Sequence, residues 1–555
     1  MSKIVSIAIL LTSVLTSSSA AQETRPTGKR LLSAERGTAV RFDSAQIAWQ
    51  SGDYLEALSR LESLLQSPDG DEVLEPIALL TGELYRVTEV ARDGSTLQWS
   101  GDGRVAAYGS GTGAGRSIHA IAITNGRVRE LASFPGFGVA LAPSGGEAAY
   151  FLVEESPALK AARAEQDGAL AAQDIASFRR RRTEVLRLES ELTRIRVRDL
   201  RSGRDRSVIS SLVPKTLVYG GDGSLYLAAA PRGSQTVSDI YRLAVGKAPV
   251  PVTNGPGLKT NPVAIPGGQR LMYALGATQF VMRDLATGES WQFEGTSPSV
   301  SRDGSAVTFV GKEPAANTVS VVRHGSQPVV VKRAERPLAN PVLSPDGRRV
   351  AYQMMPREDW ELYVTDSDGT AETRLTHEIQ HDVFPRWLSN DRILGVVGES
   401  RHRRSYLYNA STGRRTRFFH NNTVRTVAPE YEWAPNPDGA AVLIVSERDG
   451  DTVSPERGVY LLNLAQKVTK AELLERVRGA ARAESALRKR GQTMFNPIAE
   501  LVRESVADVS ITRIYGYEAD LHRFGSKYIT RPGNALAIEY LVSTLRSFGY
   551  DPELQ

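Results

Sequence analysis

The chain has 555 residues, of which 41% are hydrophobic and 24% are charged. This length exceeds a single compact core, so we expect about two to four folded units, and the composition is that of a soluble globular protein. The formal net charge of +5 is too small over this length to favour a nucleic-acid partner, and the absence of cysteine excludes disulfides, thiolate chemistry and a lipoprotein anchor.

The N-terminus has the pattern of a secretory signal peptide. Lys3 precedes an apolar stretch at 4–15, and small or polar residues follow at 16–22. The stretch is shorter than the about 20 apolar residues that span a bilayer. We therefore predict a cleavable signal peptide at 1–21, export to the periplasm or the medium, and a protein that is not integral to the membrane. An uncleaved anchor is the alternative.

Residues 22–83 form the next predicted unit. Apolar residues recur at helical spacing in 42–50 and 55–65, on either side of a turn at 51–54. This pattern resembles a single tetratricopeptide-type helical hairpin. One such repeat cannot bury its own apolar face, so we expect it to dock against a neighbouring part of the chain.

A strand is predicted at 84–90, before the first of eight turns. The turns share Gly, Asp or Asn residues, which adopt the positive φ of a tight hairpin. They lie at 101–103, 144–146, 221–223, 266–268, 302–304, 345–347, 389–391 and 437–439. Their period of roughly 40–50 residues is typical of a β-propeller. We expect 84–90 to complete the last blade by pairing near 441–445 and 458–464, because closure removes exposed sheet edges.

Each repeat contains four strand-like runs. Around the sixth turn, 341–352 reads as strand, turn and strand, 361–366 alternates with period two, and 372–376 ends the unit. The Ser-Pro-Asp-Gly turn, the strand ending in Leu-Tyr-Val-Thr-Asp and the closing Arg-Leu-Thr resemble TolB-type, WD-like propeller repeats. The resemblance covers about residues 90–465 and implies a mainly β fold, a seven- or eight-bladed β-propeller, which we place at 84–465. It does not identify a ligand.

A helical insertion is predicted at 156–192, where Ala, Arg, Glu and Leu are frequent and Gly168 is a candidate bend between two helices. The basic run at 179–182 is interpreted as a solvated helix face. The insertion is either a docking arm for another domain or subunit, or a hairpin without a partner.

The C-terminal segment begins with a predicted helical linker at 466–507. In 508–555 a helix and a Gly-containing loop precede 531–541, and Leu545 lies four residues before Gly549. This order resembles the opening of the di-zinc aminopeptidase family, of the leucyl aminopeptidase and glutamate carboxypeptidase type. The resemblance covers about 45 residues and implies two zinc ions held by His, Asp and Glu, with a Glu as general base.

No position of this chain matches those zinc ligands, so we expect 508–555 to be the truncated start of such a domain. Zinc is then expected only in the missing part. We assign no catalytic, cofactor-binding or metal-binding residue to this chain, and expect the chain as given to be inactive.

One segment, 377–381, satisfies the His-Glu-x-x-His pattern of zinc proteases. Its context argues against a metal site, because it follows a blade-closing strand and Pro385 disfavours a helix through Phe384. We expect a loop between blades, in which His377, His381 and Asp382 lie near the central mouth. The remaining histidines are interpreted as loop or surface residues: His119, His324, His402, His420 and His522.

The sequence therefore supports two main functional hypotheses. In the first, an exported propeller binds or gates peptide or protein substrates for an attached zinc-dependent exopeptidase. In the second, the chain is a TolB-like periplasmic interaction scaffold without enzymatic activity. Both place peptide or protein ligands at the propeller face or channel. An autonomous zinc protease using His377 and His381 is a third, less favoured hypothesis.

Overall fold

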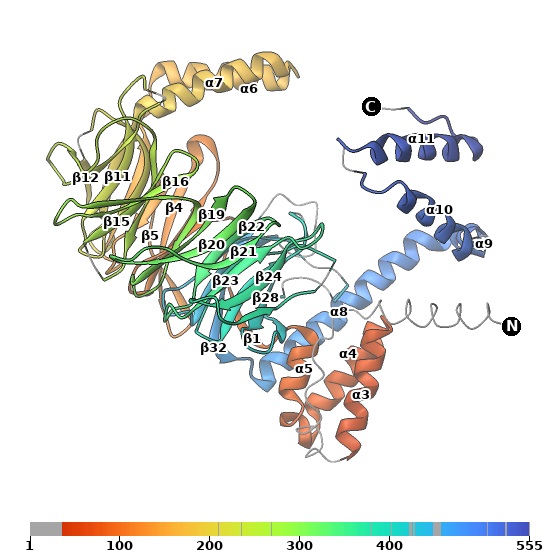
Figure 1. The fold of residues 1–555 in the computed structure, drawn as a ribbon. Helices are drawn as coiled ribbons and strands as arrows, with labels where there is room; N and C mark the ends of the chain where they lie inside the picture. The colour runs from red at the N-terminus through yellow and green to blue at the C-terminus, as the bar shows by residue number, and fades with distance from the viewer. Residues whose placement is uncertain are drawn as a thin grey trace. The chain divides into compact units, whose positions relative to one another are not determined.

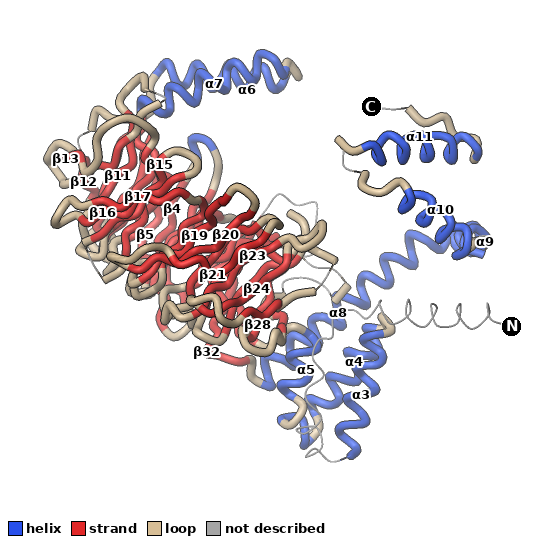
Figure 2. Tube along the Cα trace, viewed as in Figure 1, coloured by secondary structure: helices blue, strands red, loops and turns tan. Residues whose placement is uncertain are grey.

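The computed structural model describes residues 36–553 apart from 209, 235, 268, 378, 401, 421–423, 426–427, 448–456, 508 and 528–529. The predicted signal peptide at 1–21 lies outside the described residues. The chain divides into two compact units, Met1–Ala481 and Arg482–Gln555. Among the described residues, the strands form eight four-stranded antiparallel sheets, all in the first unit (Figures 1 and 2). The fold is a β-propeller with eight blades, which resolves the alternative between seven and eight.

Within each blade the first strand is innermost and the chain proceeds outward. The strands of blades 1 to 4 are β2 Ser95–Trp99, β3 Val105–Ser110, β4 Ser117–Thr124 and β5 Arg127–Pro135; β6 Phe137–Leu141, β7 Glu147–Val153, β8 Thr193–Asp199 and β9 Asp205–Val208; β10 Val213–Tyr219, β11 Leu225–Ala230, β12 Asp239–Leu243 and β13 Val250–Pro251; β14 Lys259–Ile265, β15 Arg270–Leu275, β16 Gln279–Asp284 and β17 Ser290–Glu294.

Blades 5 to 8 repeat this order, and the last blade takes its outer strand from the N-terminal side. Their strands are β18 Thr296–Val300, β19 Ala306–Glu313, β20 Ala316–Arg323 and β21 Val329–Ala334; β22 Leu338–Leu343, β23 Arg349–Met354, β24 Glu361–Asp366 and β25 Glu372–Arg374; β26 Asp382–Trp387, β27 Arg392–Val397, β28 Arg404–Asn409 and β29 Arg415–Arg417; β30 Glu430–Pro435, β31 Ala441–Glu447, β32 Arg457–Lys467 and β1 Tyr85–Ala91.

The ring is closed by the pairing of β1 with β32. Val87 pairs with Leu462 and Thr88 with Leu461, so strands from opposite ends of the propeller sequence lie side by side (Figure 1). This confirms the predicted completion of the last blade and the pairing near 458–464. The predicted pairing near 441–445 is wrong, because β31 lies on the other side of β32. A buried apolar cluster also joins blade 8 to blade 1, where Leu443 and Leu461 pack with Ala106 and Tyr108. Comparable clusters fill the interfaces between the other neighbouring blades.

All eight predicted turns connect the first strand of a blade to the second. In blade 6, Ser344 Oγ donates to Asp346 Oδ1 at 2.6 Å and accepts from the backbone N–H of Arg349 at 2.9 Å. The same Ser–Asp hydrogen bond occurs in blades 1 and 5, through Ser100 and Ser301. The Asp therefore stabilises the turn by accepting local hydrogen bonds, which is the physical cause of the repeated sequence pattern.

The N-terminal helices pack on the edge of blades 7 and 8. They are α3 Arg36–Gln50, α4 Tyr54–Gln66, the 3-10 turn η1 Pro68–Asp71 and α5 Leu74–Thr81. Leu58 and Leu61 of α4 share one buried cluster with Phe418, Leu462 and Leu473, the last of these on α8 (Lys470–Phe495). The prediction that this helical hairpin docks against a neighbour is confirmed.

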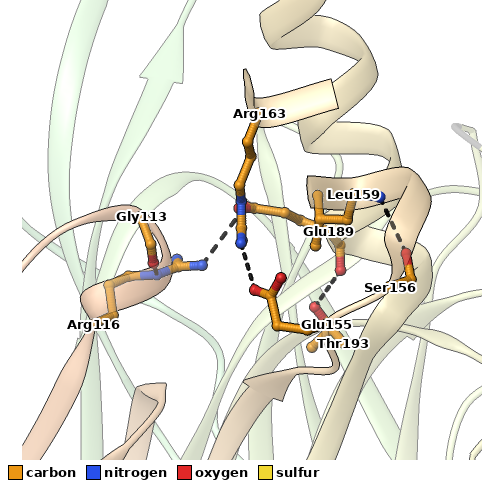
Figure 3. A network of polar contacts seen from close by, with 8 residues as sticks. All are labelled: Gly113, Arg116, Glu155, Ser156, Leu159, Arg163, Glu189 and Thr193. Carbon is orange, nitrogen blue, oxygen red and sulfur yellow. Dashed lines mark hydrogen bonds and ion pairs between the residues drawn. The ribbon is translucent and has the colours of Figure 1, made fainter. Parts of the chain in front are cut away.

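The insertion is a helical hairpin between β7 and β8 of blade 2, with α6 at Pro157–Ala171 and α7 at Ile175–Leu192 (Figure 2). Its base is fixed by ion pairs (Figure 3): Arg163 lies 2.7 Å from Glu189 and 2.5 Å from Glu155, and Arg116 of blade 1 lies 3.6 Å from Glu189. The prediction of a bend at Gly168 is wrong. The helix continues to Ala171, and the turn follows at 172–174, where Gln173 has a φ of 57°.

The second unit contains only helices among its described residues. They are the end of α8, the 3-10 turn η3 Asn496–Ile498, α9 Ala499–Ala507, α10 Ile511–Arg523 and α11 Pro532–Ser547. Helices α10 and α11 contact each other through Tyr540, whose hydroxyl donates to Asp520 at 3.0 Å. In the described part of the chain, no helix is both long and apolar enough to cross a membrane.

Candidate ligand-binding channel

A cavity with a volume of about 1260 Å³ lies inside the ring of blades. The innermost strands of all eight blades line it, together with the turns that follow them in every blade but the seventh. One lining residue from each blade, in blade order, is Trp99, Leu141, Tyr219, Ile265, Val300, Leu343, Trp387 and Pro435. Most small-molecule pockets measure about 300–1,000 Å³, so this channel has room for a short peptide segment.

The inner edge of each sheet faces this channel. Each first strand pairs with only one strand of its own blade, the second, and stands at the end of the strand order. Backbone N–H and C=O groups on such an edge are the groups that an extended peptide uses when it adds to a sheet. The channel therefore offers main-chain hydrogen bonds together with an apolar wall.

Two tryptophans of the lining are fixed by bonds between blades. Trp99 donates through Nε1 to the carbonyl of Ala434 at 2.8 Å, and Trp387 donates to the carbonyl of Val342 at 3.0 Å. In each case the inner strand of one blade is tied to the inner strand of the preceding blade. These bonds hold the channel wall in one arrangement before any ligand enters.

Two arginines carry the positive charge of the lining, Arg386 on β26 and Arg302 in the turn of blade 5. Water reaches both side chains, yet protein surrounds them closely enough that burial lowers the pKa of each guanidinium. Both remain protonated, because a free guanidinium titrates above about pH 12. The lining also contains two carboxylates, Asp102 and Asp438.

The segment 377–381 lies outside this lining. Its described residues are not helical, so His377 and His381 are not placed on one helix face as a zinc-protease motif requires. His381 Nδ1 accepts the backbone N–H of Trp360 at 3.0 Å, and its Nε2 lies 3.3 Å from Glu399. Glu378 falls outside the described residues.

The expectation that Asp382 lies near the mouth for ligand contact is wrong, because its side chain is buried. Tyr408 donates to it at 2.9 Å. Of the other histidines, His119 stacks on Tyr108 with ring centroids 4.8 Å apart, and His420 lies 3.2 Å from Glu83. Within the described ranges, no three His, Asp or Glu side chains gather as a metal site.

The arginines of the channel were missed by reasoning from motifs, but a signal for them exists in the repeat. Arg386 is the last residue but one of its first strand. The same position in the other blades holds uncharged residues: Gln98, Ala140, Val218, Ala264, Ser299, Val342 and Ala434. Arg302 likewise stands where the other turns have Gly101, Pro143, Gly221, Pro266, Pro345, Asn390 and Pro437. Each arginine is the one charged residue of its set.

No family model matches the chain. Over 77 residues it is 35% identical to the Tol-Pal system protein TolB of Thioalkalivibrio sulfidiphilus, a match that covers 14% of this chain and 16% of that protein. The matched segment therefore spans about a sixth of the length of that curated relative.

Similar solved structures include a putative TolB from Agrobacterium tumefaciens, with 14% identity, 61% of this chain and 94% of that chain covered, and a TM-score of 0.28. The β-propeller domain of the Trilobed protease from Pyrococcus furiosus has 10% identity, covers 69% and 96%, and has a TM-score of 0.36. A puromycin-hydrolyzing peptidase of Mycobacterium tuberculosis has 13% identity, covers 67% and 61%, and has a TM-score of 0.39. Because these TM-scores are below 0.5, we draw no functional argument from them. The chain carries an eight-bladed β-propeller, and over 77 residues its sequence is similar to that of TolB.

Proposed function

We propose that the propeller is a binding module that takes a protein or peptide segment into its axial channel. The observation that carries this proposal is the cavity of about 1260 Å³ to which all eight innermost strands contribute. Its wall combines apolar side chains, open backbone edges and fixed tryptophans, which together suit an extended polypeptide better than a small compact ligand.

A matched pair of substitutions tests this proposal. Val263 lines the channel and is 41% exposed, whereas Val329, which is 50% exposed, lies on the outer strand of blade 5. Val263→Trp fills the channel, and Val329→Trp adds the same bulk outside it. A defined pool of synthetic octapeptides is dialysed against each protein, and the retained peptides are quantified by mass spectrometry.

We expect the wild type and Val329→Trp to retain peptides and Val263→Trp to lose them. Equal retention by all three proteins would place binding outside the channel and overturn the proposal. Thermal unfolding of each variant checks that the propeller is still folded.

We also propose that the chain is exported, on the basis of the charged and apolar pattern at 1–21. Fusion of 1–40 to alkaline phosphatase, which is active only after export, tests this directly. N-terminal sequencing of the mature protein locates cleavage. Enzyme activity equal to that of a leaderless fusion would overturn the assignment.

A second candidate function is cooperation with a zinc-dependent exopeptidase, as the resemblance of 508–555 implies. The supporting observation is the apolar surface of the second unit, where Ile511 is 83% exposed, Leu536 48% and Leu541 46%. Such surfaces are ordinarily covered by protein. The experiment measures hydrolysis of aminoacyl p-nitroanilides by the native protein purified from its source. Activity lost on chelation and restored by zinc supports this function, and absence of hydrolysis leaves the scaffold function in its place.

A further inference from the structure

The axial channel contains a positive sector built from two blades. Arg302, from the turn of blade 5, donates through Nη2 to the carbonyl of Leu388 at 3.3 Å. Leu388 follows β26 of blade 7 and is two residues beyond Arg386. Both arginines line the same cavity, from elements that are 84 residues apart in sequence, and the Arg302 contact ties the turn of blade 5 to the segment that follows β26.

Neither arginine has a carboxylate in ion-pair contact within the described part of the chain. The hydrogen bond that the structure gives Arg386 runs from Nη1 to the carbonyl of Pro385 at 3.1 Å. Burial lowers the pKa of Arg386 without a compensating acid, and for Arg302 the nearby charge of Asp438 opposes the effect of burial only in part. Such a cation, partly desolvated and facing open space, is stabilised when an anion arrives.

The acidic residues of the lining do not fill this role, because their own turns use them. Asp102 Oδ1 accepts from Ser100 Oγ at 2.6 Å and from the backbone N–H of Arg104 at 3.1 Å. Asp438 Oδ1 accepts the N–H of Ala440 at 2.7 Å. These carboxylates are held at the turns by local hydrogen bonds, so they are not free to move onto the arginines.

Resting on the proposed function, we infer that the polypeptide bound in the channel presents a carboxylate to Arg386 and Arg302. The guanidinium fork binds carboxylates through paired charge-assisted hydrogen bonds, which fixes the orientation of the ligand as well as its affinity. The carboxylate belongs either to an acidic side chain or to the C-terminus of the ligand.

Three octapeptide probes separate these sources. The first has neutral side chains and a free C-terminal carboxylate, the second is the same peptide with an amidated C-terminus, and the third is amidated and carries two Glu residues. Binding is measured by isothermal titration calorimetry at low and at moderate salt. We expect the amidated neutral peptide to bind at least tenfold more weakly than one of the two carboxylate peptides, and the tighter complex to weaken as salt rises.

The variants Arg386→Gln and Arg302→Gln identify the groups responsible. A hydrogen bond to a charged group contributes about 1.5–3 kcal/mol, so each variant should weaken carboxylate-peptide binding by roughly tenfold to a hundredfold. Arg386→Lys retains the charge and should restore part of the affinity. Arg129→Gln is the control, because Arg129 is an exposed arginine on β5, the outer strand of blade 1, and its loss changes net charge equally.

Two results distinguish failure of this inference from failure of the proposed function. If all three peptides bind equally and Val263→Trp abolishes the binding, the channel binds peptides but the carboxylate preference is overturned. If Val263→Trp leaves the binding of every peptide intact, the channel proposal itself falls. If Arg129→Gln weakens binding as much as Arg386→Gln, general charge rather than the channel arginines is responsible, and the inference is overturned.

Discussion

The contact between blades 8 and 1 provides a sharp test of how the ring is held closed. Glu432, on the innermost strand of blade 8, accepts the backbone N–H of Thr96 at 2.8 Å and of Leu97 at 2.6 Å, both on the innermost strand of blade 1. One side chain thus joins two strands that lie 335 positions apart in the chain. Replacement of Glu432 by Ala removes both acceptors at once.

The cost follows from the surroundings of the two donors. A buried donor left without a partner costs about 1–3 kcal/mol, whereas an exposed donor regains its hydrogen bond from water. Leu97 is 5% exposed and Thr96 is exposed, so essentially one donor is left unpaired. We expect Glu432→Ala to lower the free energy of unfolding by about 1–3 kcal/mol. Glu432→Gln retains one acceptor oxygen and should lose less.

Urea unfolding followed by circular dichroism measures this difference as a shift of midpoint at constant slope. Glu130→Ala, at an exposed position on β5, serves as the control and should shift the free energy of unfolding by less than about 0.5 kcal/mol. If Glu432→Ala shifts the midpoint no more than this control, the hydrogen bonds of Glu432 do not hold the ring closed, and the reasoning from unpaired donors is refuted.

Three further predictions follow from the same structure. Gly439→Ala should destabilise the propeller by more than about 2 kcal/mol in urea unfolding, because Gly439 has a φ of 72° and an added Cβ would lie 1.8 Å from the carbonyl oxygen of Leu388. The control Gly221→Ala should be nearly neutral, because no atom lies within 4 Å of the added Cβ. Arg163→Ala should speed amide hydrogen exchange in 157–192 by roughly tenfold, because it removes the ion pairs at the base of the hairpin. A tenfold change corresponds to about 1.4 kcal/mol in the free energy of opening. Unchanged exchange would show that those ion pairs are dispensable. Burial raises the pKa of Glu432 above its usual value of 4.5. Its stabilising contribution is therefore complete below pH 4.5 and is lost as pH rises through the folded-state pKa. The stability deficit of Glu432→Gln should shrink as pH rises above 4.5, and a deficit that grows would contradict the assignment.

The fold was predictable because the repeat contains a turn that hydrogen bonds between neighbouring residues stabilise. In Ser344-Pro345-Asp346-Gly347 the Ser and Asp side chains bond to each other and to nearby backbone N–H groups, and the Gly adopts a φ of 66°. A hairpin stabilised within five residues leaves the same sequence pattern in each blade that uses it, whatever packs around it. The closing strand was predictable for a different reason, since a propeller sequence begins with a strand that has no blade of its own.

Features that depend on how distant elements meet were not predictable in the same way. Gly168 looked like a bend, but the neighbouring residues keep it inside α6, and Asp174 fixes the start of α7 by accepting the N–H of Ser177 at 3.0 Å. Asp382 looked available to a ligand because it follows a loop. Its side chain is directed into the blade, where it meets Tyr408 on β28. Neither outcome is contained in the local spacing of apolar residues.

The channel arginines are visible in the sequence as departures from the repeat, but their role depends on how distant blades meet. They show what a propeller sequence reveals about its ligand. The hydrogen bonds that make the repeat recognisable also occupy the turn carboxylates, so an aspartate at these turns is explained by the turn itself. A basic residue at a lining position has no such local partner. Such a residue needs a partner across the ring or in a ligand. Arg302 donates a hydrogen bond to a backbone carbonyl, and the charge of Asp438 offsets its burial only in part. In a closed ring of eight blades, an unmatched arginine in one or two copies of a lining position is therefore a stronger indication of an anionic ligand than the net charge of the chain.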